Sequence, residues 1–313
     1  MMDITDRHCR YFYRLLSPNC RLYTEMINVN AVLNGDKQKL LGFDSSEQPL
    51  ALQVGGSEPK KLARVTKIAH EMGYREINLN CGCPSKKVIS GNFGVTLMQN
   101  PTHVAECYKA MKNAANIEVT VKHRLAIDDN EDYEFTYNFV KALNDAGCKV
   151  FIVHARNAIL SGISPKKNRC VPPIRMTYVR KLKKDFSDCT IVANGELKSV
   201  KECIKILDLN NSVRDSSIDG IMIGRGIVNN PWMLVNLEES LFTANCNVPS
   251  RPENIIYKLD KYFKNQIKRG CKPTQISKQW KNLFKGQRGS KLWNKFISEG
   301  FSPVEAFKKF NLM

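Results

Sequence analysis

The sequence has no long apolar run, and this absence excludes one class of protein. No segment approaches the roughly 20 consecutive apolar residues that a membrane-spanning helix needs. The first residues have the spacing of an amphipathic helix, without the basic head, apolar run and cleavage site of a signal peptide. We therefore expect a cytoplasmic protein that has no membrane partner.

Histidine is scarce, and the cysteines, although frequent, do not have the pattern of a disulfide framework. The 11 cysteines are odd in number and scattered from Cys9 to Cys271, which is not the pattern of a disulfide-stapled secreted protein. Only Cys81 and Cys83 lie close together, and the five histidines do not have zinc-ligand spacing. We therefore expect a reducing compartment and no metal site. The Cys81–Cys83 pair follows a strand-like run, where it could be a metal clip, a disulfide or one working thiol beside a packing thiol.

Acidic residues are outnumbered, most of all towards the C-terminus. The chain has 48 Lys and Arg against 30 Asp and Glu, a net charge of +18. Residues 251–313 contain 15 basic and four acidic residues (+11), and residues 1–250 contain 33 and 26 (+7). A polyanion would be a natural partner for such a segment. A solvated helical surface has the same composition, so the charge alone leaves both interpretations open.

Strand-like and helix-like segments alternate through the first 240 residues. Patterns typical of helices fill the gaps between the strands, for example at 59–73, 103–115 and 133–147. Such alternation predicts parallel strands joined by crossover helices. The expected strands lie at 22–27, 50–55, 76–82, 118–124, 149–156, 190–195 and 220–225.

Two folds have this alternation, and the sequence favours one of them. A doubly wound sheet would carry a Gly-rich fingerprint after its first strand, and none is present. Polar residues instead end nearly every strand, as in a barrel whose site is built from all strand ends. We predict an α/β protein with a TIM (β/α)8 barrel over residues 1–245, in which Asp6–Leu16 is the first helix. The seven strands are one fewer than such a barrel needs.

The alternation stops after Leu241, and the rest of the chain has helical spacing. We expect a small all-helical domain over residues 246–313, with helices at 255–267, 279–285, 290–298 and 303–310. Its aromatic residues Trp280, Phe284 and Trp293 are expected to form its own core. The polar segment 208–217 is expected to be a surface loop without chemistry.

The ends of the expected strands carry the candidate site residues. Lys122 ends an apolar strand, and a lysine buried there must find an anion or lose its charge. Asn194-Gly195 and Gly224-Arg225 follow the last two strands, where barrels often bind a phosphate; two ordinary turns would look the same. His154 could equally be a core histidine. The full set is Gln53, Asn80, Cys83, Lys122, His154, Arg156, Asn194, Gly195, Gly224 and Arg225.

Taken together, these motifs resemble one protein family. NLNCGCPSKKVISGNFGVTLM, ALQVGG, VTVKHR, FIVHAR, ANGE and IGRG resemble the tRNA-dihydrouridine synthases over nearly the whole chain. The segments LYTEMI, LSGISPKKNRCVPPI and FKGQRGSKLWNKF are similar to those of the dihydrouridine synthase A group. The resemblance implies an FMN enzyme that reduces the C5=C6 bond of uridines in the tRNA D loop, U20 and U20a, with NADPH as electron donor.

The resemblance also implies roles for individual residues. Cys83 matches the family's general acid. Cys81 matches a position at which the residue type varies within the family. The residues matched to FMN are Met1, Gln53, Lys122, His154, Asn194, Gly195, Glu196, Gly224 and Arg225. Those matched to substrate tRNA are Asn80, Arg156, Lys166, Arg169, Lys291 and Asn294. The family usually has arginine at the last two positions, so Lys291 keeps the charge without the bidentate fork and Asn294 keeps neither.

The same comparison motivates an expectation about the missing strand. In the family an Ala-Pro-Met sequence ends the first barrel strand and lies against the flavin, and Met1 matches its methionine. We therefore expect the first strand upstream of residue 1, in a working protein roughly 10 residues longer.

Two other functions remain open on the sequence alone, alongside the expected monomeric enzyme. One is an FMN-dependent oxidoreductase that acts on a free pyrimidine, for which a strongly basic helical segment has no evident use. The other is a non-catalytic tRNA-binding protein.

Overall fold

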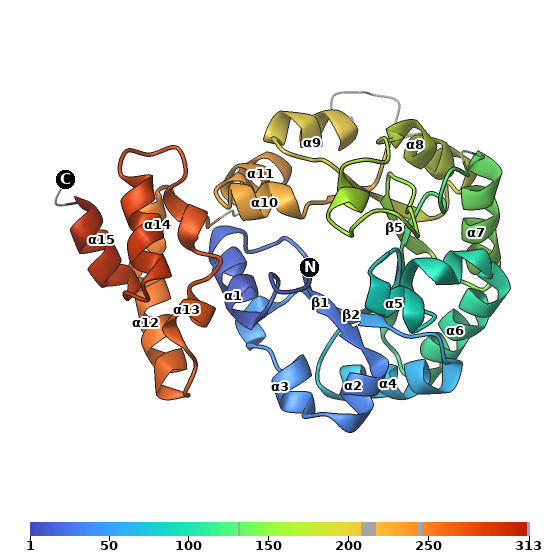
Figure 1. Cartoon of the computed structure of the whole chain (residues 1–313), viewed down its shortest axis with the longest axis horizontal. Helices are drawn as coiled ribbons and strands as arrows, with labels where there is room; N and C mark the ends of the chain where they lie inside the picture. The colour runs from blue at the N-terminus through green and yellow to red at the C-terminus, as the bar shows by residue number, and fades with distance from the viewer. Residues whose placement is uncertain (131, 208–216, 243–246, 312–313) are drawn as a thin grey trace.

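One parallel sheet forms the centre of the molecule. The computed structural model (Figure 1) describes residues 1–130, 132–207, 217–242 and 247–311. Seven strands pair in chain order, each parallel to the next, and the sheet curls as the wall of a (β/α)8-type barrel. The strands are β1 (Leu22–Asn28), β2 (Leu50–Gly55), β3 (Glu76–Cys81), β4 (Glu118–Arg124), β5 (Val150–His154), β6 (Thr190–Asn194) and β7 (Gly220–Met222).

Helices surround the sheet and then continue into a separate group at the C-terminal end of the chain (Figure 1). Those of the barrel are α1 (Arg7–Leu16), α2 (Val29–Asn34), α3 (Lys37–Leu41), α4 (Pro59–Glu71), α5 (Lys86–Ser90), α6 (Pro101–Ala114), α7 (Tyr133–Asp145), α8 (Met176–Asp185), α9 (Val200–Leu207), α10 (Arg225–Asn229) and α11 (Met233–Leu241). Those of the C-terminal group are α12 (Ile256–Lys268), α13 (Pro273–Ile276), α14 (Ser290–Ser298) and α15 (Pro303–Asn311).

The helix starts follow from local sequence. The side chain of Asp6 accepts a hydrogen bond from the Cys9 amide (2.8 Å) and so caps α1. Asp132 caps α7 in the same way. Proline stands in the first turn of α4 and of α6, where its missing N–H group costs no hydrogen bond.

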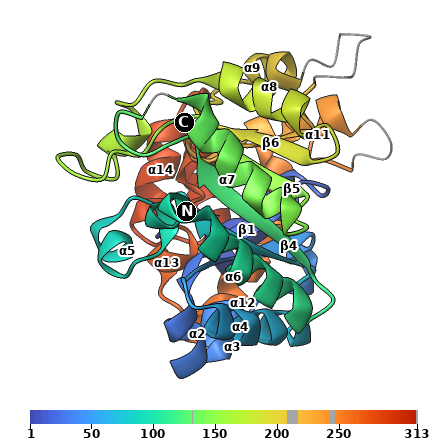
Figure 2. The same ribbon diagram turned by 90° about the vertical axis from the view of Figure 1, so that its right-hand side faces the viewer.

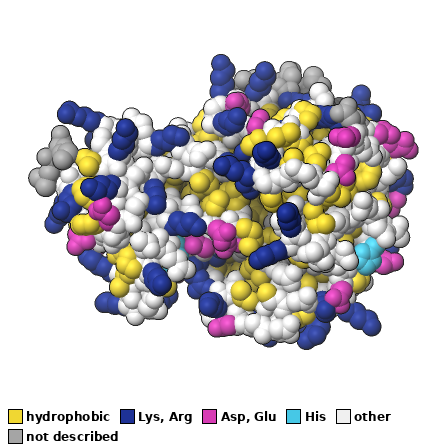
Figure 3. Space-filling view, in the orientation of Figure 1, with side chains coloured by type: hydrophobic (Ala, Val, Ile, Leu, Met, Phe, Trp, Pro, Cys, Tyr) yellow, Lys and Arg dark blue, Asp and Glu magenta, His cyan; other side chains and the backbone are white. Residues whose placement is uncertain are grey.

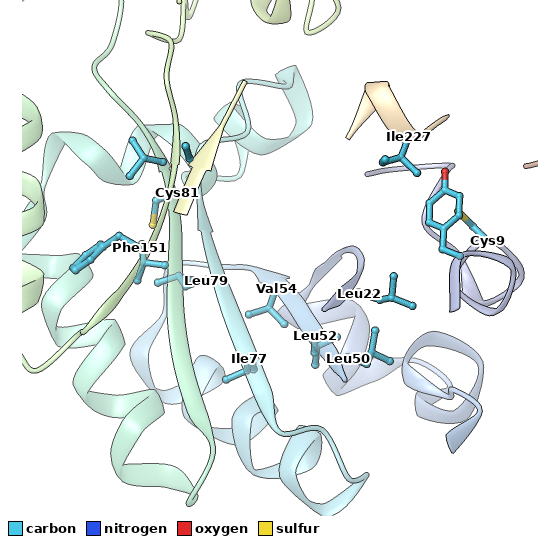
Figure 4. Packing of buried hydrophobic residues seen from close by; sticks show 14 of the residues in the cluster. Cys9, Leu22, Leu50, Leu52, Val54, Ile77, Leu79, Cys81, Phe151 and Ile227 are labelled. Atoms are coloured by element: carbon cyan, nitrogen blue, oxygen red, sulfur yellow. The ribbon is translucent and has the colours of Figure 1, made fainter. Parts of the chain in front are cut away.

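Alternate residues of the strands face two different surroundings. On β3 and β4, Ile77, Leu79 and Val121 belong to the buried hydrophobic core (Figure 4). The residues between them are polar, and side chains along a strand point alternately to opposite faces. The core therefore lies between the sheet and its helices, and β3 and β4 present polar side chains to the inside of the barrel.

The register of the sheet brings the polar strand ends together. Asn80 pairs with Lys122 across β3 and β4, and His154 pairs with Asn194 across β5 and β6. The strands end at the same rim of the barrel because all of them are parallel. The site residues predicted from separate segments therefore meet at one mouth.

The structure confirms the predicted barrel and most of its helices, and the largest changes are at the ends of two strands. The strand expected at 149–156 ends at His154, so Arg156 lies in the following loop. The strand expected at 220–225 ends at Met222, and Arg225 instead begins α10. Within the described residues no backbone pairing joins β1 to β7. The loop expected at 208–217 and the boundary at residue 246 fall almost entirely outside the described residues.

The C-terminal helices have an aromatic core, as predicted. Trp280, Phe284 and Trp293 have no exposed surface, and the Trp293 indole donates a hydrogen bond to the Trp280 carbonyl (2.9 Å). The group also packs against α1: the rings of Tyr11 and Tyr262 stack with their centres 3.9 Å apart. None of the helices in the described ranges is long and apolar enough to cross a membrane.

A buried histidine behind the sheet makes stability depend on pH. His123 of β4 is fully buried, its Nδ1 lies 2.6 Å from the Arg124 carbonyl, and burial lowers its pKa to about 4. The unfolded chain, with a histidine pKa near 6.5, therefore binds a proton in this pH range that the folded chain does not.

We expect the free energy of unfolding to fall as the pH drops from about 6.5 to about 4, with His123 contributing up to about 3 kcal/mol of the loss. Urea unfolding at a series of pH values measures this for the wild type and for His123→Asn, whose amide replaces Nδ1. The variant should have the shallower pH dependence. His70→Asn, at an exposed position on α4, should match the wild type; equal slopes for all three proteins would contradict the assignment.

Candidate functional site

A lysine that has no anionic partner among the described residues lies at the barrel mouth. Lys122 Nζ donates a hydrogen bond to Asn194 Oδ1 (3.0 Å), and Asn194 Nδ2 donates to the Met222 carbonyl (2.8 Å). Lys122 makes no ion pair with any residue that the structure describes. Its side chain retains some exposed surface, but the surrounding protein desolvates the amine and, with the charge of Arg124, lowers its pKa to about 8. An anion placed here would favour the charged amine and raise this pKa again.

Asn80 holds the loop that carries Cys83. Its Oδ1 accepts hydrogen bonds from the amides of Gly82 (3.0 Å) and Cys83 (2.9 Å), and its Nδ2 donates to Gln53 Oε1 (2.9 Å). The Cys83 carbonyl accepts a bond from the Val95 amide (3.2 Å). Both backbone groups of Cys83 are therefore fixed, and its side chain is partly exposed.

Two features near Cys83 explain the local sequence. Gly94 has φ +68°, and a Cβ there would lie 2.7 Å from the Cys83 carbonyl oxygen, so only glycine fits. Cys81, two residues before Cys83, has no exposed surface, and burial raises its pKa well above the usual range. The pair is thus divided into one packing thiol and one accessible thiol, and the described cysteines are all free.

Arg124 links two loops of the mouth, and sequence reasoning missed it. It is 3% exposed, its Nε donates to the Gly82 carbonyl (3.1 Å), and its NH1 donates to the carbonyls of Asn157 (2.7 Å) and Asn168 (2.9 Å). It thereby ties the Cys83 loop to the loop between β5 and α8, and both loops project from the same side of the barrel (Figure 2). Burial lowers its pKa to about 10.

The loop between β5 and α8 carries the predicted tRNA residues Lys166 and Arg169, both exposed. Arg225 NH2 donates to the Arg169 carbonyl (2.8 Å), so this arginine contacts the loop as well as the end of β7. Arg156 is 3% exposed and pairs with Glu196 (2.7 Å) while donating to the Cys170 carbonyl (3.2 Å). The structure thus buries Arg156 under the loop.

Backbone positions without a side chain lie at the ends of β6 and β7. Gly195 has φ +134°, and a Cβ there would lie 2.8 Å from the Ile174 side chain. A Cβ at Gly224 would lie 3.0 Å from Met1 Sδ, so the predicted cofactor residues Met1 and Gly224 are neighbours. Burial, with the charges of nearby Arg and Lys residues, holds the pKa of His154 well below its usual range.

Lys291 and Asn294 lie on α14, in the C-terminal group and not at the barrel mouth (Figure 1). Asn294 lines a cavity of about 490 Å³ beside the first residues of the chain, together with Lys278 and Lys281. Its Oδ1 is buried without a hydrogen-bond partner among the described residues. Lys and Arg side chains surround the barrel on the face drawn in Figure 3 and also lie over the C-terminal helices.

Polar residues below the mouth were also missed. Glu76, Asn78 and Thr120 are buried inside the barrel, at positions that alternate with apolar residues on β3 and β4. That alternation was a visible signal, because polar residues at every second position of an otherwise apolar strand must share one face. No group of three or more His, Cys, Asp or Glu side chains in the described ranges could hold a metal ion.

Comparison with known proteins places this chain in a family. Residues 1–312 match the family described as Dihydrouridine synthase (Dus). The chain belongs to the dihydrouridine synthase family. It is therefore an oxidoreductase of the type that this family name describes.

Similar proteins support the same assignment. A "tRNA-dihydrouridine(20/20a) synthase" of Synechocystis sp. is 44% identical over 299 residues, which cover 96% of this chain and 87% of the relative. The protein of that name from Vibrio parahaemolyticus is 43% identical over 300 residues, 96% of this chain and 89% of the relative. Among solved structures, morphinone reductase has a TM-score of 0.53 at 10% identity, over 76% of this chain and 82% of that protein. This last similarity concerns the fold alone.

The contacts of Arg124 predict how the mouth of this dihydrouridine synthase family member is held together. Arg124→Met removes three hydrogen bonds to carbonyls and leaves those groups without partners, which should cost about 2–4 kcal/mol of stability. Urea unfolding measures the cost, and limited proteolysis should cut the loop between β5 and α8 faster in the variant. Arg180→Met on α8, which removes only two longer bonds to carbonyls of α9, should change neither result by much. Equal effects of the two substitutions would show that the hydrogen bonds of Arg124 do not hold the loop more strongly than those of Arg180 hold α9.

Proposed function

We propose that this protein reduces the C5=C6 bond of D-loop uridines U20 and U20a in tRNA, with FMN as its cofactor and NADPH as electron donor. The family and the names of the similar proteins support the reaction and the two positions. The observation that carries the proposal is the fixed backbone of Cys83 at the same barrel mouth as the desolvated amine of Lys122.

The donor set at the mouth fits an anionic flavin nucleotide. Lys122 is a desolvated amine with no carboxylate beside it among the described residues, and a flavin that gains negative charge would supply the missing partner. When bound, FMN supplies the hydride for C6 of the uracil. The residues that would hold it are Met1, Gln53, Lys122, His154, Asn194, Gly195, Glu196, Gly224 and Arg225.

Two of these groups suit the phosphate end of the cofactor. Gly195 and Gly224 follow neighbouring strands and have no Cβ to block a close approach of a ligand to their backbone. Arg225 would add a charge, although in the structure it donates to the Arg169 carbonyl. The loop after β5 and the cofactor site therefore share one arginine.

Cys83 is proposed as the general acid of the reaction. Reduction of C5=C6 requires a proton at C5, and a thiol donates one when it is within reach of the carbon. The Asn80 side chain and the Val95 amide fix the direction in which the Cys83 side chain leaves the loop. The uracil must leave the folded tRNA to reach this mouth, so we propose that the target base is flipped into it.

Basic residues on the barrel rim and on the C-terminal helices would hold the tRNA body. Lys166, Arg169 and Lys291 are exposed for phosphate contacts. Asn80 and Asn294 are polar groups for contacts with the nucleotide, and Arg156 would act through the loop that it supports. We propose that residues 246–313 form the tRNA-binding domain of a monomer that works in the cytoplasm, where its thiols stay reduced.

The role of Cys83 is tested by Cys83→Ala. We expect dihydrouridine formation to fall by at least a hundredfold, because the proton donor is lost, while FMN stays bound and is still reduced by NADPH. Dihydrouridine in tRNA and the flavin absorbance measure the two steps. Cys81→Ala is the matched control and should keep most of the activity. Full turnover by the Cys83 variant would contradict the assignment, and equal turnover of free uracil would favour a free-pyrimidine enzyme.

The tRNA contact of the C-terminal helices is tested with Lys291→Ala. The affinity for tRNA should weaken and depend less on salt, the slope of log K against log salt becoming shallower by about 0.7–0.9 for one lost phosphate contact. Filter binding between low and moderate salt measures the slope. Lys60→Ala, at an exposed position on α4, is the control and should leave the slope unchanged. The same slope for Lys291→Ala and the wild type would exclude Lys291 from the interface.

A further inference from the structure

A single line of hydrogen bonds runs down the inside of the barrel from the Cys83 loop. Gly82 and Cys83 donate their amides to Asn80 Oδ1, and Asn80 Nδ2 donates to Gln53 Oε1 (2.9 Å). Gln53 Nε2 then donates to Asn78 Oδ1 (2.9 Å). Each amide side chain accepts from the group above and donates to the group below.

The line ends on a buried carboxylate. Asn78 Nδ2 donates to Thr120 Oγ1 (2.8 Å), and the Thr120 hydroxyl donates to Glu76 Oε1 (2.7 Å). Glu76 is 2% exposed and also accepts from the Tyr23 hydroxyl (2.8 Å) and from Arg21 NH1 (2.5 Å). Desolvation and the neighbouring Glu76 raise the pKa of Tyr23 well above its usual range, so Tyr23 remains a donor.

The two ends fix the direction of every bond between them. Backbone amides can only donate, and an ionised carboxylate can only accept. An amide side chain, in contrast, can be turned by 180° with little change in shape, so its orientation is set by its partners. With the Glu76 carboxylate as acceptor, Thr120 must donate downwards, Asn78 must present its Nδ2 to Thr120, and Gln53 must present its Nε2 to Asn78.

We infer that Glu76 is a positioning residue for the reaction, which acts through Thr120 and Asn78 to fix the amide orientation of Gln53 and Asn80. This inference rests on the proposed function, in which Gln53 contacts the flavin and Asn80 holds the Cys83 loop. Glu76 lies at the start of β3, at the opposite end of the strand from Cys83. Its carboxylate holds the lower end of the line, as the Gly82 and Cys83 amides hold the upper end, so that Gln53 and Asn80 keep one amide orientation.

A pair of glutamates allows a matched test. Glu76 and Glu118 are partners in the register of β3 and β4, and both contact Arg21 NH1. Only Glu76 touches Thr120, and Glu118 is 45% exposed. In Glu76→Gln the new amide can donate to Thr120, so the lower end no longer opposes the reverse order of bonds and only the Gly82 and Cys83 amides still hold Asn80. Glu118→Gln leaves both ends of the line intact.

The test uses the full chain loaded with FMN and measures turnover of tRNA with NADPH. Glu76→Gln should lower kcat about tenfold, leave KM for tRNA within twofold and change the visible circular dichroism of the flavin. Glu118→Gln should change none of these. Thr120→Val should behave like Glu76→Gln, and Thr120→Ser, which keeps the hydroxyl, should restore wild-type behaviour.

A readout without catalysis separates this inference from the proposed function. Hydrogen exchange of the Gly82 and Cys83 amides should be at least fivefold faster in Glu76→Gln and in Thr120→Val than in the wild type, Glu118→Gln or Thr120→Ser. If the wild type neither binds FMN nor turns over tRNA, the proposed function fails and amide exchange alone decides about Glu76. If Glu76→Gln does not fold, the two Thr120 variants decide. Unchanged kcat, flavin spectrum and exchange in folded variants would overturn the inference.

Discussion

Every polar side chain inside the barrel must find its partner within the protein. The interior of β2, β3 and β4 contains Gln53, Asn78, Asn80 and Thr120, all of them buried. Burying such groups without hydrogen bonds would cost several kcal/mol in total, on the order of 1–3 kcal/mol each. The strand register meets this constraint by placing hydrogen-bond donors beside acceptors on neighbouring strands. The Cys83 loop joins the same set of hydrogen bonds through Asn80.

This constraint explains why the mouth is fixed before any ligand arrives. The Asn80 side chain accepts a hydrogen bond from the Cys83 loop with its Oδ1 and donates one to Gln53 with its Nδ2. Arg124 adds ties between loops that are far apart in the sequence. A site in which Cys83 is positioned by side chains that are themselves held by others loses little freedom when a ligand binds.

The fold and the mouth were largely predictable from the sequence, for a physical reason. Local hydrophobic periodicity predicts the alternation of strands and helices, and parallel strands necessarily bring their C-terminal ends to one rim. That is why Gln53, Asn80, Lys122 and Asn194 could be grouped without a structure. The strand ends were less certain: Arg225 begins α10, because the last strand is only three residues long.

The contacts between side chains could not be predicted in this way. That Arg124 reaches the Asn157 and Asn168 carbonyls depends on loop conformations that no periodicity encodes. Arg156 could be assigned to the mouth by its position after β5, but its burial against Glu196 depends on the Gly195-Glu196 turn, where both residues have positive φ. The roles of the site residues remain proposals, as does residue 246 as a domain boundary.

The stacking of Tyr11 on Tyr262 joins the first helix of the chain to its last quarter. His8 adds a contact of 2.8 Å to the Tyr262 hydroxyl, and the Asn282 side chain donates to the Val228 carbonyl (2.9 Å). During synthesis α1 leaves the ribosome long before α12, because about 240 residues separate them. The outer side of α1 thus stays without these partners until about 240 further residues have been made, and the barrel acquires this packing only when the C-terminal helices arrive.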